Sequence, residues 1–301
     1  MSVSPEQLAA LVAVVDEGTF EAAARALHVT PSAVSQRIRA LEVEVGRVVV
    51  VRSVPCRPTA AGESVLRMAR QHRLIELELA AELQLGSGGP VELAVAVNAD
   101  SVGSWFTAVL AACAQWPEVT LRLHVHDQQR SAELLRTGTV LGAVTADPTA
   151  VQGCSTTPLL TVRYTAAATR SLVDRHRRGR SVDLATMPLV RFSADDDLQQ
   201  HVLDRRGITV RPPTHVVPDS AGFEAAVLAG LGWGVLLPDQ LRRLRDDDVV
   251  PLGRDDHVDV PLYWQRWRLP SSHLDRLTAL VTEAARASSR PAARATRRTP
   301  R

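Results

Sequence analysis

The chain has 301 residues, of which 45% are hydrophobic and 23% charged; the length favours about two domains and the composition is typical of globular proteins. No run of roughly 18 or more apolar residues occurs, which excludes a hydrophobic transmembrane helix, and the N-terminal stretch lacks the basic start of a signal peptide. The formal charge of +2 combines 35 arginines, no lysine and 33 acidic residues; without the last sixteen residues, which hold six arginines and no acid, the balance is −4, so global charge gives no support for nucleic-acid binding.

Three cysteines, Cys56, Cys113 and Cys154, are spread through the chain. Their odd number and wide spacing exclude a disulfide framework, and no CxxC pair indicates a zinc site. This use of cysteine predicts a protein of the reducing cytoplasm with neither disulfide nor structural metal.

Residues 1–58 show three helical patterns and then a short β-like end at "VVVV" (48–51). Each helical pattern has one apolar stripe, so three short helices can share one small core. The stripes are Leu8, Leu11, Val12 and Val15, then Phe20, Ala23, Ala24 and Leu27, and finally Val34, Ile38, Leu41 and Val45. A tight turn at "HVT" (28–30) separates the second helix from the third.

The third helix has two different faces. Thr30 is a suitable N-cap, and Pro31 suits the first helical position, where its missing N–H costs nothing. Opposite the apolar stripe lie side chains that can reach base edges in a major groove, namely Ser32, Ser35, Gln36 and Arg39. The helix N-terminus also presents free N–H groups to a phosphate. A solvated face on an ordinary three-helix unit is the alternative, and the local charge, six arginines against six acids, does not decide between them.

Residues 59–85 form one long helical pattern. Val65, Met68, His72, Ile75 and Leu79 recur along it at alternating spacings of three and four, which predicts a seam for a partner helix. A single exposed helix of this length would be poorly stabilised without such packing. His72 is interpreted as a packed or partly exposed residue rather than a ligand. "GSGGP" at 86–90 then predicts a flexible break.

Beyond this break, strand-like and helical segments alternate to about residue 287, which predicts an α/β architecture with a largely parallel sheet. The expected strands are "VELAVAV", "VTLRLHVHD", "VLGAVT", "RYTAAAT", "PLVRFS", "THVVPDS", "WGVLLP" and "VPLYWQRWRL". Helical patterns lie at 104–115, 131–137, 198–206 and 221–229. The tail "SSRPAARATRRTPR" has no apolar period and is expected to be disordered.

This α/β region has no metal motif, no GxSxG and no phosphate loop, which favours a binding module over an enzyme. "GLGWG" (230–234) superficially matches a dinucleotide loop, but it precedes a strand and opens no helix, so it is interpreted as a glycine turn. Ligands of such folds lie at the carboxyl ends of strands. After "VELAVAV", Asp100 or Ser101 is expected to cap a helix, and Ser101 could hold a carboxylate; a cap without any ligand stays equally open.

Two stretches, "TFEAAARALHVTPSAVSQRIRALEVEVG" and "VVVVRSVPCRPTAAG", resemble the winged helix-turn-helix of LysR-type transcriptional regulators. The match covers the whole N-terminal region, and the long helix and α/β remainder agree with it. Within that family, "RSVPCRPTAAG", "VNADSVGSWF" and "GLGWGVLLPDQ" with "PLYWQRW" resemble the LysG/ArgP branch. That branch consists of sensors of basic amino acids that activate an exporter gene.

The resemblance implies a modular chain with a two-lobed, periplasmic-binding-protein-like effector domain. The expected parts are a winged helix-turn-helix at 1–58, a linker and dimerisation helix at 59–89, an effector domain at 90–287 and a disordered basic tail at 288–301. Lobe I is expected at about 90–161 and 265–287, and lobe II at about 162–264. The chain would cross between the lobes at a hinge that allows ligand-linked closure.

Carried onto the DNA-binding region, the resemblance assigns base reading to Pro31, Ser32, Ser35 and Gln36, and chemistry adds Arg39. The implied phosphate contacts are Thr30, Arg37, Arg52 and Arg57. Phosphate contacts would fix the register on DNA, while base contacts would carry the sequence preference. Proline at position 31 stands where many relatives have a polar reader, so readout there should be weaker or apolar.

In the effector domain, the resemblance implies a cleft for a basic amino acid, with Asn98, Asp100 and Ser101 at one strand end. The distal cation needs an anionic partner, for which the candidates are Asp127, Asp195, Asp196 and Asp197; at least one of these is expected to be only a cap. Thr145 and Ser220 are expected to line the cleft. Trp233 either packs against the bound side chain or fills the hinge region, and Trp264 and Trp267 are expected in the core.

The resemblance also implies the partners. Paired linkers and paired effector domains would give a homodimer and then a tetramer, which predicts an interrupted palindromic site in double-stranded DNA. RNA polymerase is a further candidate partner, and no cofactor, metal, catalytic residue or membrane contact is expected. The predicted function is a cytoplasmic regulator that senses lysine, arginine or histidine and controls an amino-acid exporter gene. The alternatives are the same regulator with an aromatic or organic acid as effector, and an enzyme with a helical dimerisation appendage.

Overall fold

The structure is a computed structural model, and it describes residues 3–83, 90–125, 128–244 and 248–289. The predicted break at 86–90 and the predicted basic tail therefore lie largely outside the described residues. The chain groups into two compact units. Among the described residues, the first comprises those within 1–98, 105–157 and 263–287, and the second those within 99–104 and 158–262.

The N-terminal part of the first unit is a three-helix bundle with a short hairpin. Its elements are α1 (Pro5–Glu17), α2 (Phe20–Ala26), α3 (Pro31–Val45), β1 (Val50–Val51) and β2 (Arg57–Pro58). Ser4, Thr19 and Thr30 each cap a helix by accepting a backbone N–H, which satisfies donors that would otherwise lack partners. The predicted stripes form one core that includes Leu11, Val34, Ile38 and Leu41, each with no exposed surface.

The linker helix α4 (Ala60–Glu82) begins against the hairpin. Thr59 caps it by accepting the N–H of Gly62 at 3.0 Å, and a Cβ at Gly62 would lie 1.9 Å from the carbonyl oxygen of Val49, so glycine lets the helix cross the strand closely. The predicted seam is only partly correct. Met68, Ile75 and Leu79 are exposed, whereas Val65 is 8% exposed and packs into the DNA-binding core.

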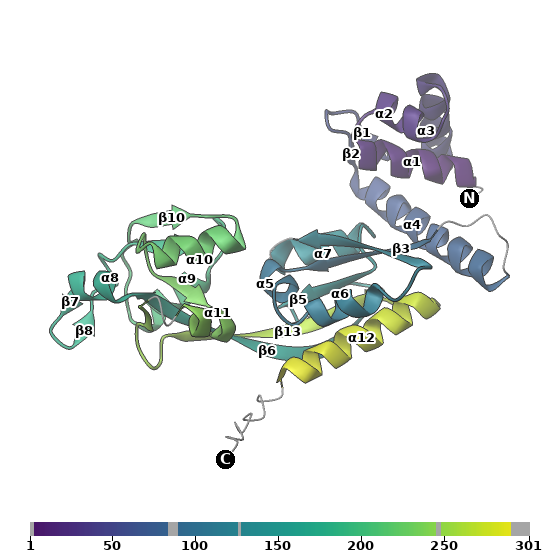
Figure 1. The fold of residues 1–301 in the computed structure, drawn as a ribbon. Coiled ribbons are helices and arrows are strands. Elements are labelled where there is room, and N and C mark those ends of the chain that lie inside the picture. The colour runs from purple at the N-terminus through teal and green to yellow at the C-terminus, as the bar shows by residue number, and fades with distance from the viewer. Residues whose placement is uncertain (1–2, 84–89, 126–127, 245–247, 290–301) are drawn as a thin grey trace, which may run out of the picture. The chain divides into compact units, whose positions relative to one another are not determined.

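The α/β part of the first unit is a sheet covered on both faces (Figure 1). Its elements are β3 (Val91–Val97), α6 (Thr107–Cys113), β4 (Val119–Val125), α7 (Gln128–Arg136), β5 (Gly142–Thr145) and α12 (Ser272–Ser289). Strand β3 pairs in parallel with β4 and β5, and the end of β13 pairs antiparallel with β5. Two tryptophans that the sequence placed in the core mark the two faces. Trp264 donates to Thr278 of α12, and Trp267 donates to the carbonyl of Leu135 in α7.

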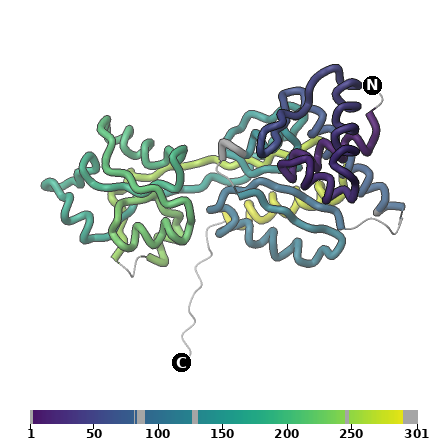
Figure 2. The backbone as a smooth tube through the Cα atoms, turned by 90° about the horizontal axis from the view of Figure 1, so that it is seen from above, coloured from purple at the N-terminus to yellow at the C-terminus, as the bar shows by residue number. Residues whose placement is uncertain are grey.

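The second unit contains short helices and strands around parts of two long strands, β6 and β13. They are α5 (Ala99–Val102), β6 (Cys154–Thr169), α8 (Arg170–Arg175), β7 (Arg177–Arg178), β8 (Ser181–Val182), β9 (Leu189–Arg191), α9 (Leu198–Arg205), β10 (Thr214–Val216), α10 (Ser220–Leu228), β11 (Gly234–Leu236), α11 (Pro238–Arg243), β12 (Val249–Pro251) and β13 (His257–Trp267). Strands β9 and β10 are parallel, while β11 and β12 pair antiparallel with β6. Strands β6 and β13 both run through the boundary between the units, and Figure 2 shows them neighbouring one another.

The fold class predicted from the sequence is confirmed: an N-terminal helix-turn-helix is followed by a long helix and a mixed α/β region. The expectation of a largely parallel sheet is wrong, because β13 pairs antiparallel with β5, and β11 and β12 pair antiparallel with β6. "GLGWG" is a glycine turn in which Gly230 has φ +71°, and it leads into β11. Within the described residues, no helix is both long and apolar enough to span a bilayer.

Candidate functional site

Helix α3 has the two faces that its sequence predicts. Val34, Ile38 and Leu41 are fully buried in the bundle. The opposite side is solvent-accessible: Pro31, Ser32, Gln36 and Arg39 are exposed, and Ser35 and Arg37 are half-buried. Thr30 accepts the N–H of Ala33 at 3.2 Å, so the same residue that is predicted to touch phosphate also fixes the start of the helix. The structure therefore leaves all five predicted base-reading side chains at least partly accessible to solvent.

The hairpin of β1 and β2 forms a wing beside this helix bundle. The loop between its strands is tied to the turn between α1 and α2 by the N–H of Cys56, which donates to the carbonyl of Gly18 at 2.7 Å. Its base is tied to α3 by Glu42, which accepts the N–H of Val49 at 3.0 Å. The two predicted phosphate contacts on the wing, Arg52 and Arg57, are exposed, and neither has a carboxylate within 4.0 Å among the described residues. Both cations are thus available to an anionic partner.

In the second unit, the structure places one predicted effector residue in an unusual setting. The Oδ2 atom of Asp100 accepts a hydrogen bond from the hydroxyl of Tyr164 at 2.9 Å, and Tyr164 is only 3% exposed. Burial raises the pKa of Asp100; the Tyr164 hydrogen bond lowers it, while the charges of Asp196 and Glu224 raise it further. Burial, together with the charge of Asp100, raises the pKa of Tyr164 well above its usual value.

The expectation that Asp100 or Ser101 caps a helix is wrong. Helix α5 begins at Ala99, so both residues lie inside it. Ser101 is buried, 2% exposed, and the Asp100 side chain is committed to Tyr164 instead of the helix start. Sequence reasoning could not find this contact, because 64 residues separate the two partners.

Of the three consecutive aspartates, one has a structural role. Asp196 accepts the N–H groups of Phe192 at 3.0 Å and Leu198 at 3.2 Å, which agrees with the prediction that at least one would be a cap. Asp195 and Asp197 are exposed, and Asp197 lies 3.6 Å from His201 on the next turn. Asp196 nevertheless contributes its charge to the surroundings of Asp100.

Buried polar atoms near strand β9 lack partners within the described residues. Trp233 and Gln199 have no exposed surface, yet the Trp233 Nε1 donor and the Gln199 Oε1 acceptor have no hydrogen-bond partner there. Both residues flank Val190, whose carbonyl accepts from Gln199 at 2.8 Å and whose N–H donates to Trp233 at 2.8 Å. Gln199 was not predicted to be a site residue. Its spacing of three and four residues from Val202 and Leu203 does indicate a polar side chain on the buried face of α9.

The remaining predicted effector residues have varied surroundings. Asn98 is 7% exposed and its Oδ1 has no partner in the described part of the chain. Thr145 is 1% exposed and its hydroxyl oxygen accepts the N–H of Asp147 at 2.8 Å. Ser220 is the first residue of α10, which Asp219 caps. Asp127 lies outside the described residues.

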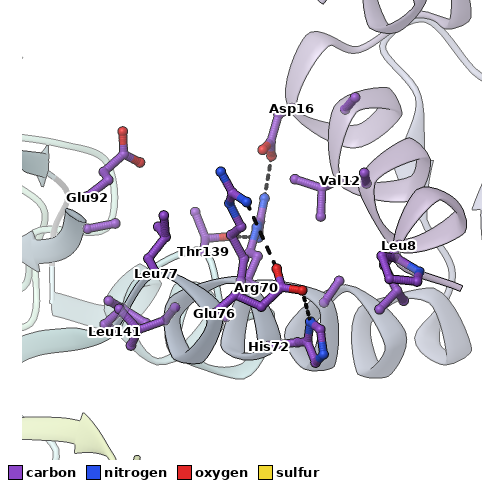
Figure 3. Close-up of a pocket in the computed structure, with 18 of the residues that line it drawn as sticks. Leu8, Val12, Asp16, Arg70, His72, Glu76, Leu77, Glu92, Thr139 and Leu141 are labelled. Carbon is purple, nitrogen blue, oxygen red and sulfur yellow. Dashed lines mark hydrogen bonds and ion pairs between the residues drawn. The ribbon is translucent and has the colours of Figure 1, made fainter. Parts of the chain in front are cut away.

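The linker helix docks on the α/β part of its own unit. In Figure 3, Arg70 reaches Asp16 of α1 on one side and Thr139 on the other; it forms an ion pair with Asp16 and donates to Thr139 at 2.7 Å. These side chains border a hollow of about 870 Å³ between α1, α4 and the sheet. Gly138 allows the close approach, because a Cβ there would lie 2.9 Å from the Cα of Arg67. Sequence reasoning did not identify this contact.

Glu78 fixes the other end of the linker helix. Its carboxylate accepts hydrogen bonds from Ser271, from the N–H and hydroxyl of Ser272 at 3.2 and 3.0 Å, and from the N–H of His273 at 3.3 Å. It thereby caps α12 from a distant part of the chain. Burial alone would raise the pKa of Glu78, but the hydrogen bonds from Ser271, His273 and Ser272 outweigh burial and lower it.

Comparison with known proteins agrees with this arrangement. Residues 5–63 match the family model described as "Bacterial regulatory helix-turn-helix protein, lysR family", and residues 87–286 match "LysR substrate binding domain". The lysine export transcriptional regulatory protein LysG of Corynebacterium glutamicum is 43% identical over 291 residues, which cover 96% of this chain and all of the relative.

Two solved structures are similar over nearly the whole length. Full-length LysG from Corynebacterium glutamicum with bound effector Arg has a TM-score of 0.78 at 42% identity, covering 96% of this chain and 100% of that one. ArgP from Mycobacterium tuberculosis has a TM-score of 0.82 at 44% identity, covering 95% and 98%. The chain therefore belongs to the LysR family of bacterial transcriptional regulators, in the branch that contains LysG and ArgP.

Proposed function

We propose that this regulator senses a basic amino acid and controls transcription of an amino-acid exporter gene. The observation that carries the proposal is the half-buried Asp100, whose carboxyl accepts a hydrogen bond from Tyr164 and is surrounded by the further negative charges of Asp196 and Glu224. Such a site is poorly suited to an anionic ligand and gains most from a cation, because burying a carboxylate is costly unless it is paired. The names of the relatives, a lysine export regulator and a structure with bound arginine, support the same choice.

Asp100 is the residue that we assign to the distal cation of the effector. Both carboxylate oxygens of Asp196 already accept backbone N–H groups, and Asp195 and Asp197 are exposed. These three aspartates therefore contribute negative potential rather than a direct contact with the effector. Asn98, Ser101, Thr145, Ser220 and Trp233 remain the predicted contacts for the rest of the effector.

On the DNA side, α3 reads the operator and the arginines of the wing bind phosphate. The exposed apolar residues of α4, Met68, Ile75 and Leu79, supply a face for the linker helix of a second copy. Such a dimer presents two α3 helices, which fits an interrupted palindromic site in double-stranded DNA. A regulator of chromosomal transcription would act in the cytoplasm.

The decisive experiment compares arginine with citrulline, which has nearly the same shape but no charge. Isothermal titration of the full chain should show binding of arginine, and of lysine with similar or lower affinity, with citrulline at least about 100-fold weaker. Asp100→Asn should abolish this discrimination, while the exposed Asp195→Asn serves as the matched control. Equal binding of citrulline, or stabilisation by an organic acid alone, would contradict the proposal.

A further inference from the structure

The wing carries two exposed arginines in different surroundings. The guanidinium carbon of Arg52 lies 4.9 Å from the ring centroid of Phe20, within the range of a cation–π contact. Arg57 has no aromatic ring beneath it among the described residues. The two side chains otherwise belong to the same small hairpin, so they form a natural internal comparison.

Phe20 is held firmly in place. It is the first residue of α2, directly after the capping residue Thr19, and it packs half-buried against the core of the bundle. Its ring therefore has an apolar side towards the core and an accessible side towards Arg52. A ring fixed in this way can hold a mobile side chain above it.

The backbone beneath Arg52 is fixed to the same body. Gly18, with φ +75°, accepts the N–H of Cys56 at 2.7 Å, and a Cβ at Gly18 would lie 3.0 Å from the Cβ of Pro55. The turn before α2 and the loop of the wing thus touch directly. As a result, Phe20 and the loop that carries Arg52 belong to one packed body.

Arg52 forms no ion pair within the described residues. No carboxylate of the described residues lies within 4.0 Å of it, and its charge lowers the pKa of the Cys56 thiol, which burial raises by more. An arginine that is oriented but unpaired loses less side-chain freedom when it meets a phosphate than an arginine that is free to rotate.

We propose that Phe20 is a positioning residue for DNA binding, whose ring holds the Arg52 guanidinium ready for a backbone phosphate. Arg52 and Arg57 both contact phosphate, but only Arg52 is pre-organised. The inference rests on DNA binding by the winged helix-turn-helix and is independent of the effector assigned above. The strength of an exposed cation–π contact corresponds to a roughly two- to fivefold change in affinity.

The test uses the full chain and a fluorescein-labelled, mixed-sequence duplex of about 40 base pairs, because phosphate contacts do not depend on sequence. Fluorescence anisotropy gives Kd between about 50 and 200 mM salt, and no effector is added. The variants are Phe20→Leu, Phe20→Tyr, Arg52→Gln and Arg57→Gln, with Phe20→Leu also combined with each arginine change.

We expect Arg52→Gln and Arg57→Gln each to lower the salt slope by about one. Phe20→Leu should weaken binding roughly two- to fivefold, and Phe20→Tyr should bind like the unchanged protein. The Phe20→Leu loss should persist alongside Arg57→Gln but disappear alongside Arg52→Gln. An equal loss in both backgrounds would show a merely structural role for Phe20 and overturn the proposal, as would an unchanged affinity for Phe20→Leu or an unchanged salt slope for Arg52→Gln.

A second variant keeps the test valid if Phe20→Leu perturbs folding. Pentafluorophenylalanine at position 20 preserves the shape of the ring but reverses the sign of its quadrupole, on which the cation–π attraction depends. Binding should weaken to the same extent as with leucine while the melting temperature stays unchanged. Undiminished affinity with the fluorinated ring would overturn the proposal without any change in packing.

Discussion

Helix α3 and the surroundings of Asp100 are built in opposite ways. The proposed DNA-reading face comes from one continuous segment of fifteen residues, and its side chains form no hydrogen bond or ion pair with the described parts of the chain. The Asp100 site draws on α5, β6, the loop before α9 and α10, and its members are also part of the fold. Substitutions on the exposed face of α3 should therefore change DNA binding without changing stability. A substitution of Asp100 should change both effector binding and stability.

The first test of this difference is the substitution Asp100→Asn, for which we expect the largest effect. Removing one partner of a buried ion pair costs about 3–5 kcal/mol, so arginine binding should weaken by roughly 100-fold or more. Because its pKa is raised in the folded chain, ionised Asp100 opposes folding. The stabilising contribution of its neutral form is complete below the ordinary pKa and is lost as pH rises through the raised value.

The asparagine variant should therefore melt at a higher temperature than the unchanged protein at pH 7, while its Oδ1 still accepts from Tyr164. This advantage should shrink as pH falls towards the ordinary aspartate range. Differential scanning calorimetry checks the stability and isothermal titration checks the binding. A variant that binds arginine normally would show that function and stability are separate at this site. A variant that melts lower at pH 7 would contradict the predicted sign of the stability change.

The second prediction concerns a contact that is assembled from distant segments but has no ligand role. Glu78→Gln should destabilise the first unit by about 1.5–3 kcal/mol, the usual contribution of hydrogen bonds to a charged group. Since the pKa of Glu78 is lowered overall, its stabilising effect is present above the ordinary glutamate pKa and is lost as pH falls through the lowered value. Urea unfolding at pH 7 and at acidic pH measures this, with exposed Glu82→Gln as control. Equal destabilisation by both changes would show that the α12 cap contributes nothing.

Sequence was sufficient for α3 because every signal is local. Thr30 and Pro31 mark the start, Gly46 with φ +71° marks the end, and the apolar period defines the buried face in between. The strand "VELAVAV" likewise coincides with β3. In each case the conformation depends on neighbouring residues, so the element and its buried face can be predicted from the sequence.

The assembled regions could not be predicted in the same way. Tyr164 was assigned only to a strand, and its role depends on Asp100, 64 residues away. Val65 fits the linker seam by spacing, yet packs into the DNA-binding core because the first turns of α4 lie against α1. Gln199 carries a weak signal, a polar side chain in a buried stripe, but its unpaired oxygen depends on the position of β9. Periodicity predicts which side of an element is buried but not what it is buried against.

The third prediction tests the local half of the comparison. Gln36→Ala should weaken binding to an operator, selected with this protein from random duplexes, by about 1–3 kcal/mol, the usual value of a good base contact. Binding to mixed-sequence DNA and the melting temperature should stay unchanged, because Gln36 is exposed and has no side-chain partner among the described residues. Val43→Ser, at a position that is 75% exposed on the same helix, is the matched control. A fall in melting temperature with Gln36→Ala would mean that α3 does not separate its two roles.

The smallest expected effect is on the pH dependence of effector binding. A bound cation favours the ionised form of Asp100, whose pKa is raised in the free protein by burial, with Asp196 and Glu224 adding to it. Arginine affinity should therefore be constant above that raised pKa and fall below it, by no more than about tenfold per pH unit for a single proton. Because the arginine side chain itself stays charged throughout, the dependence reports on the protein.

Isothermal titration between pH 5 and 7, in buffers of different ionisation enthalpy, measures both the affinity and the proton released. Binding to mixed-sequence DNA provides the comparison, since no α3 side chain in the reading face titrates in that range. In the Asp100→Asn variant, any residual arginine binding should lose its pH dependence. If arginine affinity still depends on pH in that variant, a group other than Asp100 binds the effector's cation. The link between effector binding and folding stability would then belong to that other residue.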